Sequence, residues 1–341
     1  LLMPADMYNQ SVFLVLKAAY LYYIDNKSQN EIAKQLKISV ATVSRLLKRA
    51  KKDKIVEFVI RDPYVECIHL EKSLKQEFGL QDVIIAPGVQ PGDETCSSDA
   101  EKGEVVKNLV ALEGARYLQR IIRENDVLGI TWGSTVHHLI NYLNPAQKVN
   151  ATFVTLHGSI ACCNDELDVR PLVEGISRAF SGTKYPLLTE ALMSSKQAAD
   201  VIKQEKNVAR ILKMFDEIDI SVAGMGSMYP EMRTILGKPE FMAKEDLAHL
   251  QSQKCAGDIA LRFFDLDGNE CDTDLKDRMI SIGFDQFKKI RTKIVVASGT
   301  EKSQTLLAAL KGGLIDVLII DHELGLETLA LREKEKESRT D

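Results

Sequence analysis

The sequence predicts a two-part protein, in which a small helical head of the helix-turn-helix type, winged-like in outline, precedes a larger doubly wound α/β domain. Two patterns lead to this prediction. In residues 28–54, two short stretches of helical periodicity are separated by a tight turn. After residue 82, apolar runs of strand length alternate with helical stretches, as in a parallel sheet that helices cover on both faces.

The head is expected to start with an apolar helix over residues 12–24 that packs behind the helix-turn-helix. The apolar positions of the next two helices recur one turn apart: Ile32, Ala33 and Leu36 in the first, and Val43, Leu46, Leu47 and Ala50 in the second. Ser39 is suited to cap the second helix, because its hydroxyl can accept a bond from a backbone N–H of the first turn. Lys37 stands in the turn where glycine is common, and a left-handed conformation there costs roughly 1 kcal/mol relative to glycine.

The face of the second helix opposite its apolar stripe is basic. Between residues 34 and 54 the chain carries eight basic residues and one acidic residue, Asp53. In a helix that lies in the major groove of DNA, the N-terminal residues reach base edges and the later basic residues reach phosphates. The expected base-reading residues are Ala41, Thr42 and Arg45, the expected phosphate contacts are Lys48, Arg49 and Lys52, and Gln29, Ser39 and Ser44 complete the candidate DNA-binding set. The alternative is an ordinary helix pair with a solvated basic face.

The head should end near residue 62. A short strand over residues 55–60 is expected to form the wing. Asp62-Pro63 then marks a break, because Pro63 forbids helical continuation and biases Asp62 to extended geometry. We therefore predict a DNA-binding domain over residues 1–62 and a larger second domain over residues 63–331, to which the family resemblance described below assigns effector binding and oligomerisation. A charged tail over residues 332–341 is expected to be solvated or disordered.

The larger domain is expected to open with a helix over residues 65–79, which either couples the two domains or simply packs at the front of the second. The strands are predicted at residues 83–86, 127–131, 153–156, 218–223, 293–297 and 317–320, with helices between them, for example over 101–124 and 302–310. Ligands of doubly wound sheets bind beyond the carboxyl ends of the strands. The loops that follow these strands are therefore the candidate ligand loops.

Three of these loops carry small residues and a polar side chain: Trp132-Gly133-Ser134-Thr135, His157-Gly158-Ser159 and Ser298-Gly299-Thr300-Glu301-Lys302-Ser303. Glycine permits close approach of the backbone, N–H groups at a helix start attract anions, and Lys302 adds a positive charge. Together the loops predict a phosphate or polyol pocket, although each loop alone could serve only a tight connection. The glycine spacing fits neither a P-loop nor a dinucleotide-binding fingerprint, so nucleotide binding is not expected.

Charge and composition restrict the class of protein. The net charge of −5 combines +5 in residues 1–62 with −10 in the remainder, as in a protein whose head alone meets a polyanion. The six cysteines, at positions 67, 96, 162, 163, 255 and 271, lack metal-binding spacing, so reduced thiols and no bound metal are expected. The apolar stretch over residues 12–24 is too short to span a bilayer and no signal peptide precedes it, which predicts a cytoplasmic protein.

Six segments, in order and spread over nearly the whole chain, resemble the SorC family of sugar-responsive bacterial transcription regulators. They are SQNEIAKQLKISVATVSRLLKRA from Ser28, GITWGST from Gly129, AGDIALRFFDLDG from Ala256, DRMISI from Asp277, VVASGTEKSQTLLAALKGG from Val295 and DVLIID from Asp316.

This resemblance implies a larger domain similar to the glucosamine-6-phosphate deaminase and ribose-5-phosphate isomerase fold, which binds a sugar or sugar phosphate and assembles into a dimer or tetramer. By position, it implies effector contacts from Gly133, Ser134, Thr135, His157, Gly158, Asp258, Gly299 and Lys302. Lys302 would pair with a phosphate or a sugar oxygen, and Asp258 would accept bonds from hydroxyls. Asp258 could instead be a turn or cap residue, and some family members carry Lys or Arg in place of His157.

We therefore expect a DNA-binding transcriptional regulator of a carbohydrate operon, with no enzymatic activity and no cofactor. Its partners would be double-stranded operator DNA and a sugar or sugar phosphate, and the direction of regulation remains open. One alternative is a sugar-phosphate isomerase or deaminase with an added head, for which Asp258 and His157 are the acid/base candidates. A non-DNA interaction module, the third possibility, would leave the basic face unexplained.

Overall fold

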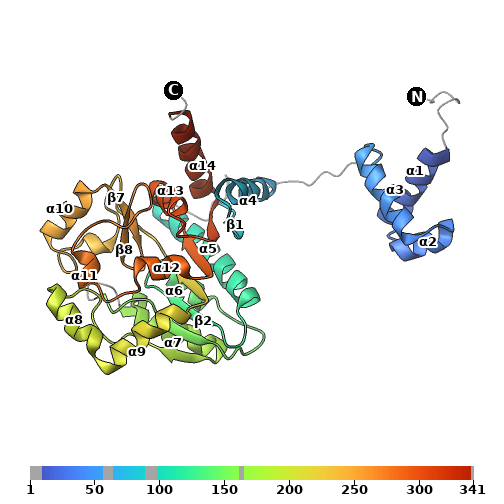
Figure 1. Ribbon diagram of the computed structural model, residues 1–341. Helices are drawn as coiled ribbons and strands as arrows, with labels where there is room; N and C mark the ends of the chain where they lie inside the picture. The colour runs from blue at the N-terminus through green and yellow to red at the C-terminus, as the bar shows by residue number, and fades with distance from the viewer. Residues whose placement is uncertain (1–9, 57–63, 89–97, 161–164, 339–341) are drawn as a thin grey trace. The chain divides into compact units, whose positions relative to one another are not determined.

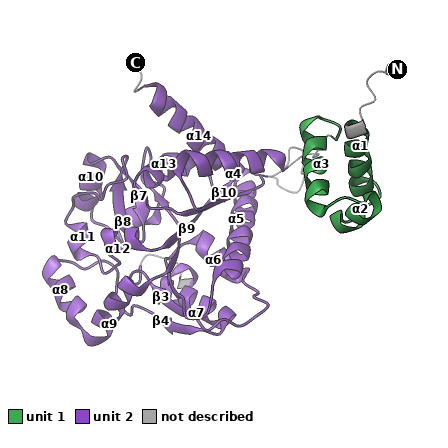
Figure 2. Cartoon of the chain, turned by 45° about the vertical axis from the view of Figure 1, so that its right-hand side comes forward, with its two compact units in different colours: residues 1–63 green, residues 64–341 purple. Residues whose placement is uncertain are grey.

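The computed structural model describes residues 10–56, 64–88, 98–160 and 165–338 (Figure 1). The chain divides into two compact units, unit 1 over residues 1–63 and unit 2 over residues 64–341 (Figure 2). Within the described ranges, none of the helices is long and apolar enough to cross a membrane.

Unit 1 contains the predicted helix-turn-helix. Its described helices are α1 (Gln10–Tyr23), α2 (Gln29–Leu36) and α3 (Val40–Lys52). Side chains from all three helices form its core, including the fully buried Val15, Ile32 and Val43. Glu31 closes a capping box on Ser28 at the start of α2, which satisfies backbone donors that the first turn cannot pair.

The predicted wing strand over residues 55–60 has no counterpart in the described part of unit 1. Ile55 and Val56 lie in a bend after the turn that ends α3, and the rest of that prediction, residues 57–60, falls outside the described residues. Both backbone N–H groups donate to the carbonyl of Ala50, at 2.9 and 3.2 Å, which folds this segment back onto the end of α3 instead of extending it.

Unit 2 is built on a fully parallel sheet of seven strands in the order β1-β10-β9-β5-β2-β3-β4. The strands are β1 (Asp82–Ala86), β2 (Val127–Ile130), β3 (Thr152–Thr155), β4 (Thr183–Tyr185), β5 (Ile220–Ala223), β9 (Thr292–Ala297) and β10 (Val317–Asp321). Six of them were predicted. The seventh, β4, was missed because it is a short, polar strand at the edge of the sheet.

Helices cover both faces of this sheet, as the alternation along β10 shows. Val317 and Ile319 point into a core formed with α5 (Asp99–Ile121), α6 (Ser134–Asn141) and α7 (Val169–Phe180). Leu318 and Ile320 point into a second core on the opposite face. The helices of that face are α4 (Val65–Phe78), α8 (Lys196–Gln204), α9 (Lys206–Met214), α12 (Phe284–Lys289), α13 (Ser303–Lys311) and α14 (His322–Glu337). The predicted doubly wound architecture is confirmed.

A small antiparallel sheet, which the sequence did not predict, stands beside the large one. Its strands are β6 (Gly226–Ser227), β7 (Cys255–Ile259) and β8 (Arg262–Asp265), and α10 (Lys244–Ser252) and α11 (Leu275–Arg278) contribute to its core. The short 3-10 helices of unit 2 are η2 (Asp165–Leu167), η3 (Phe215–Glu217), η4 (Ile235–Gly237) and η5 (Thr300–Lys302).

Of the two alternatives predicted for the tail from residue 332, solvated or disordered, disorder is wrong for residues 332–337, most of whose side chains are nevertheless exposed. They form the last turns of α14, where Arg332 pairs with Glu335 within the helix and with Glu77 of α4. Mixed charges at helical spacing stabilise a helix, and here they also attach it to a neighbour. Residues 339–341 lie outside the described residues.

Candidate functional site

Helix α3 presents one apolar and one basic face. Val43, Leu47 and Ala50 are buried in the core of unit 1. Ser39 caps the helix as predicted, because its Oγ accepts the backbone N–H of Thr42 at 3.1 Å and lies 2.8 Å from the Thr42 hydroxyl. The cap and the buried stripe together hold the opposite face of α3 toward solvent.

The candidate DNA-binding residues lie on α3, apart from Ser39, which caps it, and Gln29, which starts α2. Ala41, Arg45, Lys48, Arg49 and Lys52 are exposed, Thr42, Ser44 and Gln29 are half-buried, and the Ser39 hydroxyl is engaged in capping. The Nε of Arg45 donates to the Ala41 carbonyl at 3.4 Å, and Arg49 pairs with Asp53 at 3.0 Å. Ala41, Thr42 and Arg45 lie in the first turns of α3, where base readers of helix-turn-helix proteins stand.

Lys37 in the turn between α2 and α3 is left-handed, with φ 53° and ψ 44°. Its N–H donates to the carbonyl of Lys34 at 3.4 Å, and the next N–H, of Ile38, donates to Ala33 at 3.0 Å. Lys37 therefore adopts the left-handed conformation, in which an L-residue is less stable than glycine by roughly 1 kcal/mol.

In unit 2, a cavity of about 210 Å³ lies beyond the carboxyl ends of β2 and β5. These neighbouring strands are the point where the strand order reverses, since the chain runs outward from β2 to β3 and β4 and then returns to β5. Doubly wound sheets bind their ligands at such a point. The cavity is lined by Thr131, Trp132, Gly133, Ser134, Thr135, Leu167, Gly224, Met225, Gly226, Ser227, Arg233, Thr234, Ile235, Asp258, Ala260, Glu301 and Lys302.

Asp258 supplies a buried acceptor to this cavity. Its side chain is 3% exposed, and among the described residues its Oδ1 has no hydrogen-bond partner. Burial raises the pKa of Asp258 to about 7, against a smaller lowering by the backbone N–H of Leu261. A buried acceptor without a partner is costly unless a ligand or water supplies the missing donor.

The strand opposite Asp258 must lie close to it. Gly226 pairs with Asp258 across β6 and β7, and a Cβ on Gly226 would lie 2.2 Å from the Asp258 Oδ1. Any side chain at this position would therefore displace the carboxylate from the cavity wall.

Two features supply positive potential to the same cavity. Ser134 and Thr135 form the first turn of α6, whose N-cap, Gly133, has φ 133° and provides no capping side chain. The side chain of the half-buried Lys302 makes no hydrogen bond or ion pair with the residues that the structure describes, and burial lowers its pKa. A helix start without a capping side chain and a lysine without a direct ion-pair partner among the described residues favour an anionic group.

Three predicted effector contacts are not among the lining residues: His157, Gly158 and Gly299. His157 is fully buried, accepts the Trp132 N–H on Nε2 at 3.1 Å and, through Nδ1, donates to the carbonyl of Gly158 at 2.7 Å. Burial lowers the pKa of His157 to about 4, so the ring is neutral near pH 7. His157 therefore supports the Trp132-Gly133 turn from behind the cavity.

The two glycines have comparable supporting positions. A Cβ on Gly158 would lie 2.5 Å from the carbonyl oxygen of Thr189, and Gly299, with φ +98°, donates its N–H to Asp321 Oδ2 at 2.8 Å. Both glycines are required by backbone packing or conformation at the loops that they serve.

Several lining residues were not predicted as effector contacts, among them Gly226, Ser227, Arg233 and Thr234. Gly226 and Ser227 lie shortly after the end of β5, a position that could have identified them. Arg233, whose guanidinium lies 2.9 Å from Glu231, and Thr234 come from an irregular segment without periodicity, and no local pattern marks them.

The cavity does not bring together Asp258 and His157, the acid/base pair that the isomerase or deaminase alternative requires. Asp258 lines the cavity, whereas His157 is turned to the Trp132 backbone and does not. Within the described ranges, no group of three or more His, Cys, Asp or Glu side chains could hold a metal ion, and the described cysteines, Cys67, Cys255 and Cys271, are free thiols.

Comparison with known proteins assigns both units to regulatory families. Residues 62–329 match the Sugar-bind family, a sugar-binding domain, and residues 17–53 match region 4 of sigma-70 factors. The two units together define a transcriptional regulator with a helix-turn-helix DNA-binding unit and an α/β effector-binding domain, and not an enzyme.

The chain belongs to the SorC family of sugar-binding transcriptional regulators. The sorbitol operon regulator of Klebsiella pneumoniae is 28% identical over 317 residues, which cover 92% of this chain and 97% of that protein. The deoxyribonucleoside regulator of Bacillus subtilis is 28% identical over 308 residues, 90% of this chain and 94% of that protein. The crystal structure of the full-length Klebsiella regulator has a TM-score of 0.70 to this chain and covers 93% of it, with 99% of its own chain aligned.

Proposed function

We propose that this chain regulates a carbohydrate operon from the cytoplasm by reading double-stranded operator DNA with α3 and binding a phosphorylated sugar or related polyol in the unit 2 cavity. The observation that carries the effector half is the combination of Asp258 and Lys302 in one cavity. Asp258 offers a buried acceptor without a partner to a sugar hydroxyl, and Lys302 with the start of α6 offers positive potential to a phosphate.

The DNA half rests on α3. Arg45 can fork onto a guanine, Ala41 and the Thr42 methyl group can contact thymine, and Lys48, Arg49 and Lys52 reach phosphates. Gln29, Ser39 and Ser44 border the same face. The likeness of residues 17–53 to a sigma-factor region, and the helix-turn-helix geometry itself, support this assignment.

The chain would act as a dimer or tetramer, because helix-turn-helix units read paired half-sites on DNA. Sedimentation equilibrium of the 38.1 kDa chain tests this, and a monomer at micromolar concentration would count against it.

Thermal melting against a ligand panel tests the effector half. A ligand that binds only the folded chain raises the Tm by mass action. The names of the relatives mention sorbitol and a deoxyribonucleoside, and the positive potential of the cavity favours phosphorylated forms. The first members of the panel are therefore sorbitol 6-phosphate and deoxyribose 5-phosphate, with the unphosphorylated sugars and inorganic phosphate for comparison. We expect a rise with one sugar phosphate.

The same rise should be absent in Lys302→Ala and retained in the matched variant Lys184→Ala, in which the lysine removed pairs with Glu174 and does not line this cavity. An equal rise in Lys302→Ala would remove Lys302 from the effector site.

A further inference from the structure

Helix α14 is attached at its start to the loop that carries Lys302. Asp321, 3% exposed, caps α14 by accepting the Leu324 N–H on Oδ1 at 3.0 Å, and its Oδ2 accepts the Gly299 N–H at 2.8 Å. The Asp321 carboxylate therefore both caps α14 and holds Gly299, the residue just before η5. A shift of that turn on ligand binding changes the geometry at the first turn of α14.

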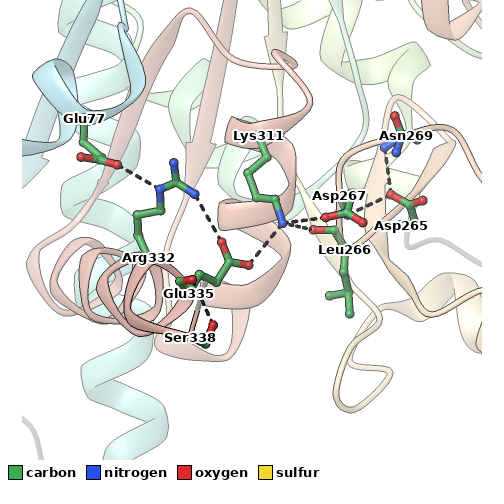
Figure 3. Close-up of polar contacts among 9 residues, drawn as sticks. All are labelled: Glu77, Asp265, Leu266, Asp267, Asn269, Lys311, Arg332, Glu335 and Ser338. Atoms are coloured by element: carbon green, nitrogen blue, oxygen red, sulfur yellow. Dashed lines mark hydrogen bonds and ion pairs between the residues drawn. The ribbon is translucent and has the colours of Figure 1, made fainter. Parts of the chain in front are cut away.

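The body of α14 is attached to α4. Gly325 lies so close to α4 that an added Cβ would be 2.8 Å from Leu70 Cδ2. Farther along, Glu77 of α4 accepts Arg332 Nε at 2.9 Å (Figure 3). The same carboxylate also accepts Lys336 Nζ at 2.6 Å. Because a 16-residue helix is a rigid rod about 24 Å long, contacts at its two ends move together.

The side of the cavity that carries Asp258 is also connected to α14. Asp258 lies on β7, which pairs with β8. The turn that follows β8 packs on the end of α13, because a Cβ on Gly268 would lie 2.4 Å from the Gly312 nitrogen. Lys311 of α13 donates to the carbonyl of Leu266 at 2.9 Å and pairs with Glu335 of α14 at 3.2 Å (Figure 3). Glu335 in turn accepts Arg332, the residue that holds Glu77.

We propose that α14 is the lever through which occupation of the cavity displaces α4. Both walls of the cavity converge on α14, and α4 is the first element of unit 2 after the segment that joins it to unit 1. A displacement of α4 moves the point from which the chain leads to the DNA-binding unit. The inference deepens the proposed function, since it describes how the effector site would be read out.

Amide hydrogen exchange of the full chain, without ligand, tests the lever directly. In Asp321→Asn, the side-chain oxygen still caps α14, but the amide nitrogen cannot accept the Gly299 N–H. We expect exchange in residues 66–78 of α4 to accelerate about tenfold, while α7, on the opposite face of the sheet, stays unchanged as the internal reference. Unchanged exchange in α4, or equal acceleration in α7, would overturn the proposal.

Glu77→Gln tests the other end, because coupling between two sites is reciprocal. This variant weakens the bonds to Arg332 and Lys336 without touching the cavity, and it should accelerate exchange in residues 299–304. The matched control is Glu174→Gln, which removes ion pairs to Arg178 and Lys184 away from α14 and should leave those residues unchanged. Effects confined to α4 and α14 would contradict the lever.

Adding sorbitol 6-phosphate and deoxyribose 5-phosphate separates the two proposals. If neither raises the Tm but both variants respond as expected, the lever stands and the effector class is wrong. If one of them raises the Tm and protects the cavity loops, while α4 exchange stays unchanged in both variants, the effector class stands and the lever is wrong.

Discussion

Asp258 is the buried acid of the proposed effector site. Burial raises its folded-state pKa to about 7, whereas an unfolded aspartate titrates near 4. Between these pH values the folded chain binds a proton that the unfolded chain has lost. The contribution of this group is therefore fully present below about pH 4 and is lost as the pH rises through 7.

We predict that Asp258→Asn removes this pH dependence. The free energy of unfolding of the natural chain relative to the variant should fall between pH 4 and 7 by up to roughly 4 kcal/mol and level off above pH 7. The Tm difference between the two proteins should follow the same course. Differential scanning calorimetry of both proteins across this range is the measurement. A difference that is constant with pH would show that Asp258 does not titrate in this window.

Lys37 allows a matched pair of substitutions in unit 1. Lys37→Gly should stabilise the unit by roughly 1 kcal/mol, because glycine adopts the left-handed conformation without the steric cost that a Cβ brings. Lys34→Gly, inside the right-handed α2, should destabilise the unit by about as much. Amide exchange in α2 and α3 measures both, and a Lys37→Gly chain that exchanges faster than the natural one would refute the strain argument.

At the scale of single elements, α3 is expected to divide its contacts between sequence reading and phosphate binding. Arg45→Ala should weaken binding to the selected operator by about 10- to 100-fold and have a smaller effect on scrambled DNA. Lys48→Ala should weaken both equally and reduce the slope of log affinity against log salt by about 1. Fluorescence anisotropy at several salt concentrations distinguishes them, with Lys72→Ala, on α4, as the control. Equal loss on both DNAs for Arg45→Ala would argue against base reading.

The elements that could be predicted from sequence are those whose burial leaves a continuous pattern. Strands β9 and β10 are fully or almost fully buried and appear as apolar runs, and the periodicity of α2 and α3 follows from their contact with one core. Strand β4 is polar and exposed at the sheet edge, so its pattern is that of a loop. The antiparallel sheet was missed because β6 has only two residues and β7 contains glycine and aspartate.

The site itself was only partly predictable for a related reason. Position in the loop after a strand indicated Ser134 and Lys302, and the family resemblance indicated Asp258, which lies in β7; all three line one cavity. Position alone could not show that His157 turns inward to the Trp132 backbone, because that depends on a contact between two neighbouring loops. Arg233 reaches the cavity from a segment whose path is set by tertiary packing, and no spacing along the chain reveals it.

At the scale of the whole molecule, the charge distribution separates the two functions. The basic residues of unit 1 favour a polyanion, whereas the acidic remainder of the chain disfavours one, so DNA affinity should reside in unit 1. The effector site lies in unit 2, and the two sites influence each other only if operator affinity differs between the empty and occupied chain. By linkage, operator DNA must then change effector affinity by the same factor.

The most direct test of this account is an anisotropy titration of the full chain with DNA that it selects from its own genome, with and without the sugar phosphate that raises its Tm. The account predicts a change in operator affinity of about 5- to 150-fold that is lost in Lys302→Ala, while this variant still binds the DNA. Operator affinity that is identical with and without bound sugar phosphate would contradict the claim that unit 2 controls unit 1.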